Sequence, residues 1–355
     1  MSGDAKLNFG STVIGAGAGT LLVAEVGLAH EGSIGLATSF IDLVCKSGFD
    51  AVKFQMHIAE AESTLDEELR VPLSFRDTSR FDYWKRTEFK PEEWVFLKAY
   101  AEDKGLIFIL SVFSREALII AEDLNLSCYK IGSGEFFTSE LVLEVFKTSK
   151  PVLISTGMST WSEINTLVEQ VVPEDVVFGL MQCTSKYPSS PATAGINLIS
   201  EFSARYGQRA VIGFSDHSGD VFSSLLAMAW GARIIEVHVT FDRQMFGPDA
   251  SSSLEFQELL QIANFRDMID LISSNPVDKD KMADEVAHLR TLFTKSVALK
   301  RDVKCGELLT EDLLCLKKPG HGLKESSVPN LIGKRVSRDV PSNRLLSPND
   351  VEDYE

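Results

Sequence analysis

The chain has 355 residues, of which 44% are hydrophobic and 24% are charged, a composition typical of a folded globular protein. Its formal net charge of -16, with no compensating run of Lys and Arg, argues against nucleic acid as a partner. The five Cys residues are scattered without a CxxC pair, and we find neither a signal peptide nor an apolar run of membrane-spanning length. We therefore expect a cytoplasmic protein without disulfides or membrane contact.

The sequence from residue 21 to about 272 alternates short apolar runs with amphipathic segments at helical spacing. We count eight such pairs, which predicts an α/β protein with a (β/α)8 TIM barrel. The predicted strands are 21-27, 51-56, 106-111, 128-132, 151-155, 176-182, 210-214 and 233-239. In the fifth unit, Ser159 or Thr160 is the expected N-cap of a helix that begins near Trp161. Gly15, Gly17 and Gly19 precede the first strand and are interpreted as a turn, because a dinucleotide fingerprint would follow a strand.

One connection between a strand and its helix, residues 57-90, is much longer than the others. A loop of this length inside a compact fold is usually functional, so we expect a lid or a substrate loop. It contains Arg70, Arg76, Arg80, Asp82, Tyr83, Trp84 and Arg86. The barrel domain is predicted to cover 1-275 and a polar linker with a helical segment 276-294. Short strands punctuated by Gly and Pro then predict a small β-rich domain over 295-355.

Polar residues at the ends of apolar strands are the candidate site, because barrel enzymes place their active sites at the carboxyl ends of the strands. In chain order they are Glu25, Lys53, Gln55, Ser111, Lys130, Ser133, Glu135, Ser155, Gln182, Ser185, Tyr187, Ser215, His217 and His238. The other histidines, His30, His57, His288 and His321, gain no support from their positions.

Two lysines and several hydroxyls on one rim are suited to a phosphate, because ammonium groups neutralise its charge while hydroxyls contact its oxygens. Lys53 or Lys130 alone would more simply extend its ammonium out of a strand end. Together, inside otherwise apolar strands, the two lysines favour a phosphate site.

His217 and His238 end neighbouring strands, so they either share a divalent ion or serve as two structural histidines. Glu25 and Glu135 follow strongly apolar segments, where partial burial would tune a carboxylate for proton transfer. The alternative for these glutamates is a structural ion pair with a lysine.

An ordered set of motifs resembles the N-acetylneuraminate (sialic acid) synthase family. The motifs are Ala24-Glu-Val-Gly-Leu-Ala-His-Glu-Gly32, Val52-Lys-Phe-Gln55, Tyr129-Lys-Ile-Gly-Ser-Gly-Glu135, Ser155-Thr-Gly-Met158, Gly213-Phe-Ser-Asp-His217 and Gly247-Pro-Asp249. The resemblance runs from about residue 10 to the end, where the chain is similar to the family's antifreeze-protein-like (SAF) domain.

The resemblance implies a transferase that adds phosphoenolpyruvate to the aldehyde of an N-acylated amino sugar, with N-acetylmannosamine as the expected acceptor. It implies that phosphoenolpyruvate is bound by Lys53, Ser111, Lys130, Ser133, Ser155, Ser185 and Ser215, with Gln55 nearby. A manganese or magnesium ion would bind His217 and His238. Glu135 would handle the proton of the water that adds, and Glu25, Tyr187 and Asp249 would orient the sugar and the metal's waters, supported by Gln182. A homodimer is also implied, in which the C-terminal domain covers the partner's barrel.

Three departures from the family pattern concern the sugar rather than phosphoenolpyruvate. Lys318 stands where the family commonly has an Arg in an Arg-Pro-Gly turn, and an ammonium cannot reproduce a bidentate guanidinium contact. Val237 replaces a basic residue before the histidine, and the 57-90 connection lacks a counterpart of the family's sugar-binding Asn. A sister enzyme that makes legionaminic or pseudaminic acid from a 2,4-diacetamido-trideoxyhexose is therefore the alternative. A Schiff-base aldolase or lyase using Lys130, and a non-catalytic carbohydrate-binding protein, explain fewer of these residues.

Overall fold

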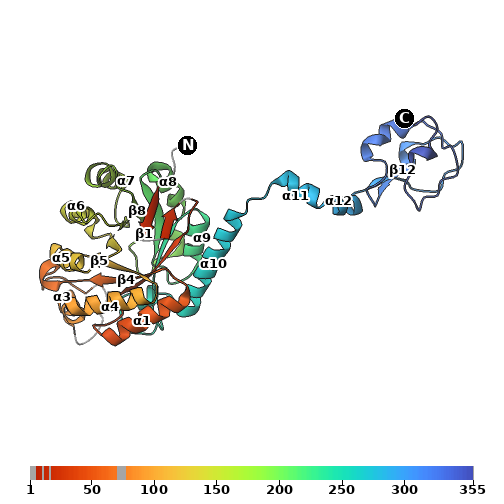
Figure 1. Cartoon of the computed structure of the whole chain (residues 1–355). Coiled ribbons are helices and arrows are strands. Elements are labelled where there is room, and N and C mark those ends of the chain that lie inside the picture. Colours follow the sequence, from red (N-terminus) through yellow and green to blue (C-terminus); the bar gives the residue numbers. More distant parts are fainter. Residues whose placement is uncertain (1–4, 10–11, 16, 70–76, 355) are drawn as a thin grey trace. The chain divides into compact units, whose positions relative to one another are not determined.

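Eight parallel strands close into a barrel in the computed structural model, which describes residues 5–9, 12–15, 17–69 and 77–354. The neighbours follow chain order, and β10 pairs with β3 to complete the barrel (Figure 1). The strands are β3 (Leu21–Gly27), β4 (Ala51–Met56), β5 (Ile107–Val112), β6 (Cys128–Ile131), β7 (Val152–Ser155), β8 (Phe178–Cys183), β9 (Ala210–Asp216) and β10 (Ile234–His238). This topology confirms the predicted (β/α)8 fold.

Helices cover the outside of the barrel. They are α1 (Ile34–Ser47), α4 (Pro91–Asp103), α5 (Arg115–Asp123), α6 (Ser139–Lys147), α7 (Trp161–Thr166), α8 (Asn197–Tyr206), α9 (Phe222–Ala229) and α10 (Phe256–Ser274). Several begin at a side-chain cap that satisfies an otherwise unpaired backbone donor. Ser33 caps α1, Ser114 caps α5, and Thr160 forms a capping box with Glu163 at α7, which selects Thr160 from the two predicted caps.

The strands are buried on both faces, and alternate side chains enter two separate cores. One face of each strand packs outward against the helices, where Leu22 and Val52 lie in the larger core. The other face fills the barrel interior with residues such as Leu21, Ala51 and Ile234. Inward residues nearer the carboxyl ends are polar. The alternation that fills the barrel interior with apolar residues therefore also directs these polar side chains into one place.

An N-terminal hairpin packs into the interior core. Its strands are β1 (Lys6–Phe9) and β2 (Thr12–Gly15), and they pair antiparallel. Leu7, Phe9 and Ile14 are buried against the inward residues at the amino ends of the barrel strands. The sequence predicted only a turn in this region, because each strand is too short to give a clear period of two.

The connection between β4 and α4 contains the short helices α2 (Ala59–Glu62) and α3 (Arg80–Thr87). Tyr83 donates a 2.8 Å hydrogen bond to Glu31, and Arg86 forms ion pairs with Glu31 and Asp77. These contacts hold α3 against the turn between β3 and α1, where Glu31 lies. Arg70 and Arg76, which the sequence singled out, lie outside the described residues.

Residues 275–355 form a second compact unit. It contains α11 (Lys279–Glu285), α12 (Ala287–Phe293), β11 (Ser296–Leu299), β12 (Leu314–Lys317) and α13 (Val328–Leu331). β11 and β12 pair antiparallel, and a core that includes Val297, Leu299, Val336 and Leu346 holds the unit together.

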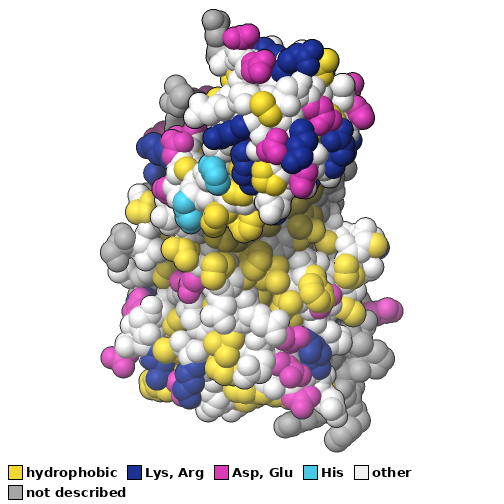
Figure 2. Space-filling view, turned by 90° about the vertical axis from the view of Figure 1, so that its right-hand side faces the viewer, with side chains coloured by type: hydrophobic (Ala, Val, Ile, Leu, Met, Phe, Trp, Pro, Cys, Tyr) yellow, Lys and Arg dark blue, Asp and Glu magenta, His cyan; other side chains and the backbone are white. Residues whose placement is uncertain are grey.

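The outer face of α9 and α10 carries exposed hydrophobic side chains, and Figure 2 views the molecule from this side. Along α9 and its C-cap, Phe222, Leu226 and Trp230 are 72%, 48% and 48% exposed at a spacing of four residues. Such a stripe is unusual for a face that only contacts water.

No helix within the described ranges is long and apolar enough to cross a membrane.

A candidate active site at the carboxyl ends of the strands

A cavity of about 610 Å³ lies at the carboxyl ends of the barrel strands. Every barrel strand contributes to its lining, and the 57–90 connection forms part of its wall. Fourteen of the residues selected from sequence line it: Glu25, Lys53, Gln55, Ser111, Lys130, Ser133, Glu135, Ser155, Ser185, Tyr187, Ser215, His217, His238 and Asp249. Because these side chains come from separate strands, only a closed barrel brings them together.

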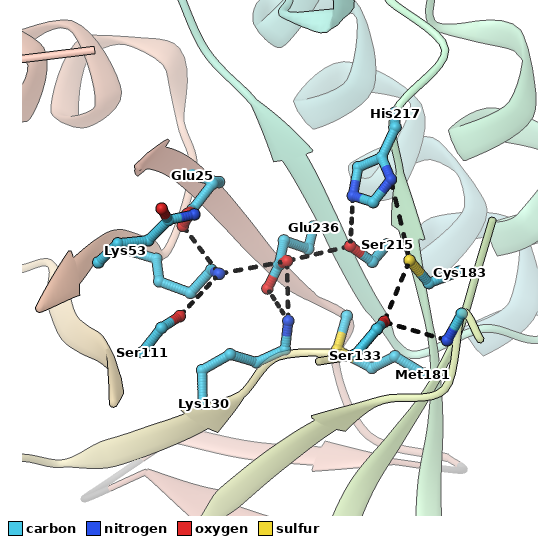
Figure 3. A network of polar contacts seen from close by, with 12 residues as sticks. Glu25, Lys53, Ser111, Lys130, Ser133, Met181, Cys183, Ser215, His217 and Glu236 are labelled. Carbon is cyan, nitrogen blue, oxygen red and sulfur yellow. Dashed lines mark hydrogen bonds and ion pairs between the residues drawn. The ribbon is translucent and has the colours of Figure 1, made fainter. Parts of the chain in front are cut away.

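Two buried lysines and two buried glutamates form the floor of the cavity (Figure 3). Lys53 Nζ lies 2.8 Å from Glu25 Oε2 and 3.3 Å from Glu236 Oε1, and it donates to Ser111 Oγ at 3.2 Å. Lys130 Nζ contacts both oxygens of Glu236, at 2.9 and 3.1 Å. The four charges balance one another inside a site that water scarcely reaches.

Glu236 was not among the residues predicted from the sequence, because those residues were chosen for their positions at strand ends. It lies in the middle of β10, two residues before His238 and two after Ile234, so strand alternation directs it inward. Although burial opposes ionisation, Lys130 and Lys53 hold the pKa of Glu236 well below its usual range. Glu236 is therefore the anion that compensates both lysines.

Hydroxyl groups surround the lysines. Ser215 donates to Glu236 Oε1 at 3.0 Å, and Ser111 accepts from Lys53. Ser155 Oγ is buried without a hydrogen-bond partner among the residues that the structure describes. A buried hydroxyl without a hydrogen-bond partner destabilises the fold unless a ligand supplies one. The position of Ser155 therefore suits an anion bound beside the lysines.

Gly157 leaves the space in which three polar side chains converge. A Cβ atom at this position would meet Ser185 Oγ, Cys183 Sγ at 2.9 Å and Ser133 Oγ at 3.0 Å. The Gly157 backbone nitrogen donates to Ser133 Oγ at 3.0 Å, and Cys183 Sγ lies 3.8 Å from the oxygens of both serines. The backbone of Ser185 is left-handed, with a φ of 49°, an uncommon conformation for a residue with a Cβ atom. The cluster is thus closely packed around a glycine.

His217 and His238 face each other across neighbouring strands, with their ring centroids 5.3 Å apart. Burial lowers the pKa of His238 to about 4, so its imidazole is neutral and retains a lone pair for a metal. Asp249 Oδ2 lies 3.7 Å from His238 Nδ1, and the hydroxyl of Tyr187 lies 3.2 Å from His217 Nε2. Within the described ranges no cluster of three or more His, Cys, Asp and Glu side chains is arranged to hold a metal. His217 and His238 are two adjacent imidazoles that could hold a divalent ion.

Glu135 begins the short 3-10 helix Glu135–Phe137 after β6 and points into the cavity. Burial raises the pKa of its carboxyl to about 7, and the Glu62 carboxyl adds to the effect. A carboxyl with this pKa exchanges protons readily near neutral pH.

His57 also lines the cavity, although its sequence position had given it no support. Its ring is stacked between Trp84, at a centroid distance of 4.4 Å, and Phe113, at 4.0 Å. Its nitrogens contact Gln55 and Glu62. The signal was absent from the sequence because the two aromatic neighbours come from distant segments.

The structure corrects one predicted substrate-binding residue, Gln182. Its side chain donates to the backbone oxygen of Ala194 at 3.3 Å and does not line the cavity. The reason is strand alternation: Met181 and Cys183 face the barrel interior, so the residue between them faces outward. Cys183 occupies the inward position that we had assigned to Gln182.

Lys318 lies in the second unit. Its ammonium is 5.2 Å from the ring centroid of Phe293, and it lines a separate cavity of about 760 Å³ with His321 and Arg344.

Comparison with known proteins identifies the family. The NeuB family profile matches residues 40–275, and the SAF domain profile matches residues 294–352. The chain is 28% identical to the N,N'-diacetyllegionaminic acid synthase of Campylobacter jejuni, over 92% of this chain and 98% of that protein. It is 29% identical to the N-acetylneuraminate-9-phosphate synthase of Mus musculus, over 94% of this chain and 93% of that protein.

A solved structure agrees with this result. The N-acetylneuraminic acid synthetase of Leptospira borgpetersenii, determined in complex with citrate, superimposes with a TM-score of 0.70 and 27% identity. The alignment covers 81% of this chain and 96% of that one. With the profile match spanning most of the barrel, the chain belongs to the NeuB family.

Proposed function

We propose that this protein condenses phosphoenolpyruvate with the aldehyde of an N-acylated amino sugar, forming a sialic-acid-type nonulosonic acid and phosphate. The observation that carries the proposal is the pair of buried ammonium groups, Lys53 and Lys130, at the carboxyl ends of the barrel strands. Membership of the NeuB family supports the same reaction class.

The donor is proposed to bind over Lys53 and Lys130, with Ser111, Ser155 and Ser215 contacting its oxygens. Because Glu25 and Glu236 already neutralise the lysines, the four-residue floor has no net charge to offer a polyanion. A manganese or magnesium ion on His217 and His238 would supply the missing positive charge and polarise the sugar's carbonyl oxygen. Ser133 and Ser185, beside Gly157, complete the proposed donor contacts.

In the proposed reaction, C3 of phosphoenolpyruvate attacks the aldehyde carbon and forms the new carbon–carbon bond, and the aldehyde oxygen takes up a proton to become a hydroxyl. Water then adds to C2 and its first proton passes to the Glu135 carboxylate. Cleavage of the bond between C2 and the phosphate oxygen forms the C2 carbonyl, and the second proton of the water leaves with the phosphate. Glu25, Tyr187 and Asp249 orient the open-chain sugar. Glu135 suits its role because burial gives its carboxyl a pKa close to neutrality.

N-acetylmannosamine is the proposed acceptor, and a 2,4-diacetamido-trideoxyhexose is the alternative. The relatives named above include both a legionaminic acid synthase and an N-acetylneuraminate-9-phosphate synthase at nearly equal identity. Lys318 at the Pro-Gly turn favours the alternative, because an ammonium makes a different contact with an acyl group from a guanidinium.

A homodimer is part of the proposal, with the C-terminal unit of one chain serving the barrel of the other. The exposed apolar stripe of Phe222, Leu226 and Trp230 is consistent with an interface between copies. Mixing Lys53→Ala protein with Lys318→Ala protein tests the arrangement, because mixed dimers would regain one intact site. If mixing restores no activity, the two residues do not meet across a dimer.

The deciding experiment measures phosphate release from phosphoenolpyruvate with Mn²⁺ against a panel of amino sugars, with products identified by mass spectrometry. Activity with N-acetylmannosamine supports a sialic acid synthase, and activity with only a diacetamido sugar supports the sister enzyme. Phosphate release with no acceptor would contradict the proposal. Borohydride trapping addresses the Schiff-base alternative, since a covalent adduct on Lys130 would be incompatible with the proposed reaction.

A further inference from the structure

A line of hydrogen bonds leads from the lysine floor to the 57–90 connection. The Gln55 amide nitrogen donates to Glu25 Oε1 at 2.8 Å, and Gln55 Oε1 lies 3.1 Å from His57 Nε2. His57 Nδ1 lies 3.0 Å from Glu62 Oε1 on α2. The side chains of His57 and Glu62 are only 5% and 6% exposed, so water does not readily replace either partner.

The aromatic clamp around His57 restricts what can change in this line. The ring lies nearly parallel to Trp84 on one side, at 10°, and to Phe113 on the other, at 18°. Rotating the imidazole out of its plane would disrupt both stacking contacts. The adjustable features are therefore the positions of protons and the orientation of the Gln55 amide.

While His57 is neutral, as its burial favours, the donor and acceptor rules allow the complete line in two forms. In the first, Glu25 is ionised, Gln55 turns its nitrogen toward it, His57 carries its proton on Nε2, and Glu62 is a protonated acid that donates to Nδ1. In the second, every bond is reversed, so that Glu25 is protonated and Glu62 is ionised. Each form has one ionised and one protonated end carboxyl.

Lys53 selects the first form. Its ammonium lies 2.8 Å from Glu25 Oε2, and removing the charge of Glu25 would leave a buried ammonium with one counter-charge fewer. The surroundings of Glu62 act in the same direction. The carboxyls of Glu67, Glu88 and Glu135 face it. Two cations oppose them, because Arg80 is ion-paired with Glu67 and Lys85 with Glu88.

Burial, together with Glu67 and Glu88, raises the pKa of Glu62 to about 8, although the Ile58 backbone nitrogen donates to its Oε1 at 2.7 Å. Burial together with Arg80 lowers the pKa of His57 to about 3, so the ring is neutral. Both directions agree with the first form. Burial also raises the pKa of Glu25, and the ion pair with Lys53 is the contact that opposes this and keeps Glu25 ionised in the first form.

We propose that Glu62 acts as a neutral carboxylic acid that donates its proton to Nδ1 of His57, and that this bond positions Gln55 and Glu25 on the sugar side of the cavity. His57 and Glu62 are positioning residues for the proposed condensation, and the inference about their effect on turnover depends on that function. The line ends on Glu25 Oε1, whereas Lys53 contacts the other oxygen, Oε2, so we expect the effect on the acceptor to exceed the effect on phosphoenolpyruvate.

The arrangement gives a pH dependence of defined sign. Below about pH 8, Glu62 is protonated and the line is complete. As the pH rises through this value, Glu62 ionises and no arrangement of the remaining protons satisfies every contact while Glu25 stays ionised and His57 stays neutral. The value of kcat/KM for the sugar is therefore expected to fall on the alkaline side, with KM for phosphoenolpyruvate changing by less than about twofold.

Variants at Glu62 test this alkaline limb of the pH profile, in which kcat/KM for the sugar falls. Glu62→Gln cannot ionise, and its amide can donate to His57, although it gives up the contact with Ile58. It should retain sugar kcat/KM within about threefold at pH 7 and lose the alkaline limb, whereas Glu62→Ala should lose about tenfold. Glu60→Gln is the matched control, because it removes an exposed carboxylate from the same helix, and it should keep the limb. If Glu62→Gln is as impaired as Glu62→Ala at pH 7, or keeps the limb, the inference is overturned.

A second measurement does not depend on catalysis. Nitrogen NMR of protein labelled in histidine, assigned by the signals that disappear in His57→Gln, reports the protonation of each ring nitrogen. We expect protonated Nε2 and unprotonated Nδ1 at pH 7. A proton on Nδ1, alone or in an imidazolium, would overturn the inference even in an active enzyme. If the wild-type protein makes no product with any sugar, the proposed function fails while this measurement still decides the state of His57.

Discussion

Lys130 donates to both oxygens of Glu236, and both residues are only 2% exposed. Glu236 Oε1 also lies 3.3 Å from Lys53, so one carboxylate compensates two ammonium groups. Removing one partner of such a buried network is costly, because the remaining charge cannot be solvated. The same pairing sets the charge that an incoming anion meets.

Glu236→Gln should therefore separate stability from anion binding. The substitution keeps the side chain's size but leaves the lysines with one counter-charge fewer, and we expect unfolding free energy at pH 7 to fall by about 3–5 kcal/mol. Inorganic phosphate should bind about tenfold more tightly, because the floor gains one net positive charge. Urea denaturation and calorimetric titration measure the two effects. An unchanged midpoint with unchanged phosphate affinity would mean that Glu236 does not compensate the lysines.

Glu135 leads to a prediction about the acidic side of the pH profile. Burial raises the pKa of its carboxyl to about 7, so the fraction that is ionised grows as the pH rises through neutrality. A group that accepts the proton of water must be ionised, and kcat should therefore increase with pH across this range. Glu135→Gln should lower kcat by about a hundredfold or more and remove this limb. A variant that retains the wild-type limb would assign the ionisation to another group.

His217→Ala should abolish metal-dependent turnover while leaving the fold intact. One imidazole would remain for the ion, and the barrel core does not depend on the missing ring because His217 lies at the cavity end of β9. Circular dichroism checks the fold, and activity after chelation and Mn²⁺ addition checks the metal requirement. Wild-type activity that survives complete metal removal would contradict the two-histidine site.

The barrel strands could be predicted because each is a short apolar run bounded by polar residues, and the hydrophobic effect dominates such a pattern. The convergence of Lys53, Lys130 and His217 followed from the barrel itself. Glu236 was missed because it lies inside a strand, where a charge is unexpected until its partners on other strands are known. Gln182 was assigned wrongly because a shift of one residue along a strand reverses the direction of the side chain. His57 depended on Trp84 and Phe113, and no local pattern reveals contacts between distant segments.

Gly157→Ala tests whether the serine cluster beside β7 contributes to donor binding. The new methyl group would press on Ser185, Cys183 and Ser133, so at least one hydroxyl must move. We expect KM for phosphoenolpyruvate to rise by about tenfold or more with a smaller change for the sugar, because the proposed donor contacts include both serines. Gly134→Ala is the matched control: it lines the same cavity with a helical φ of -69°, and its Cβ atom would meet no other atom within 4 Å. Equal effects of the two variants on both substrates would show that Ser133 and Ser185 do not bind the donor, whereas a selective loss in Gly157→Ala would assign this side of the cavity to phosphoenolpyruvate.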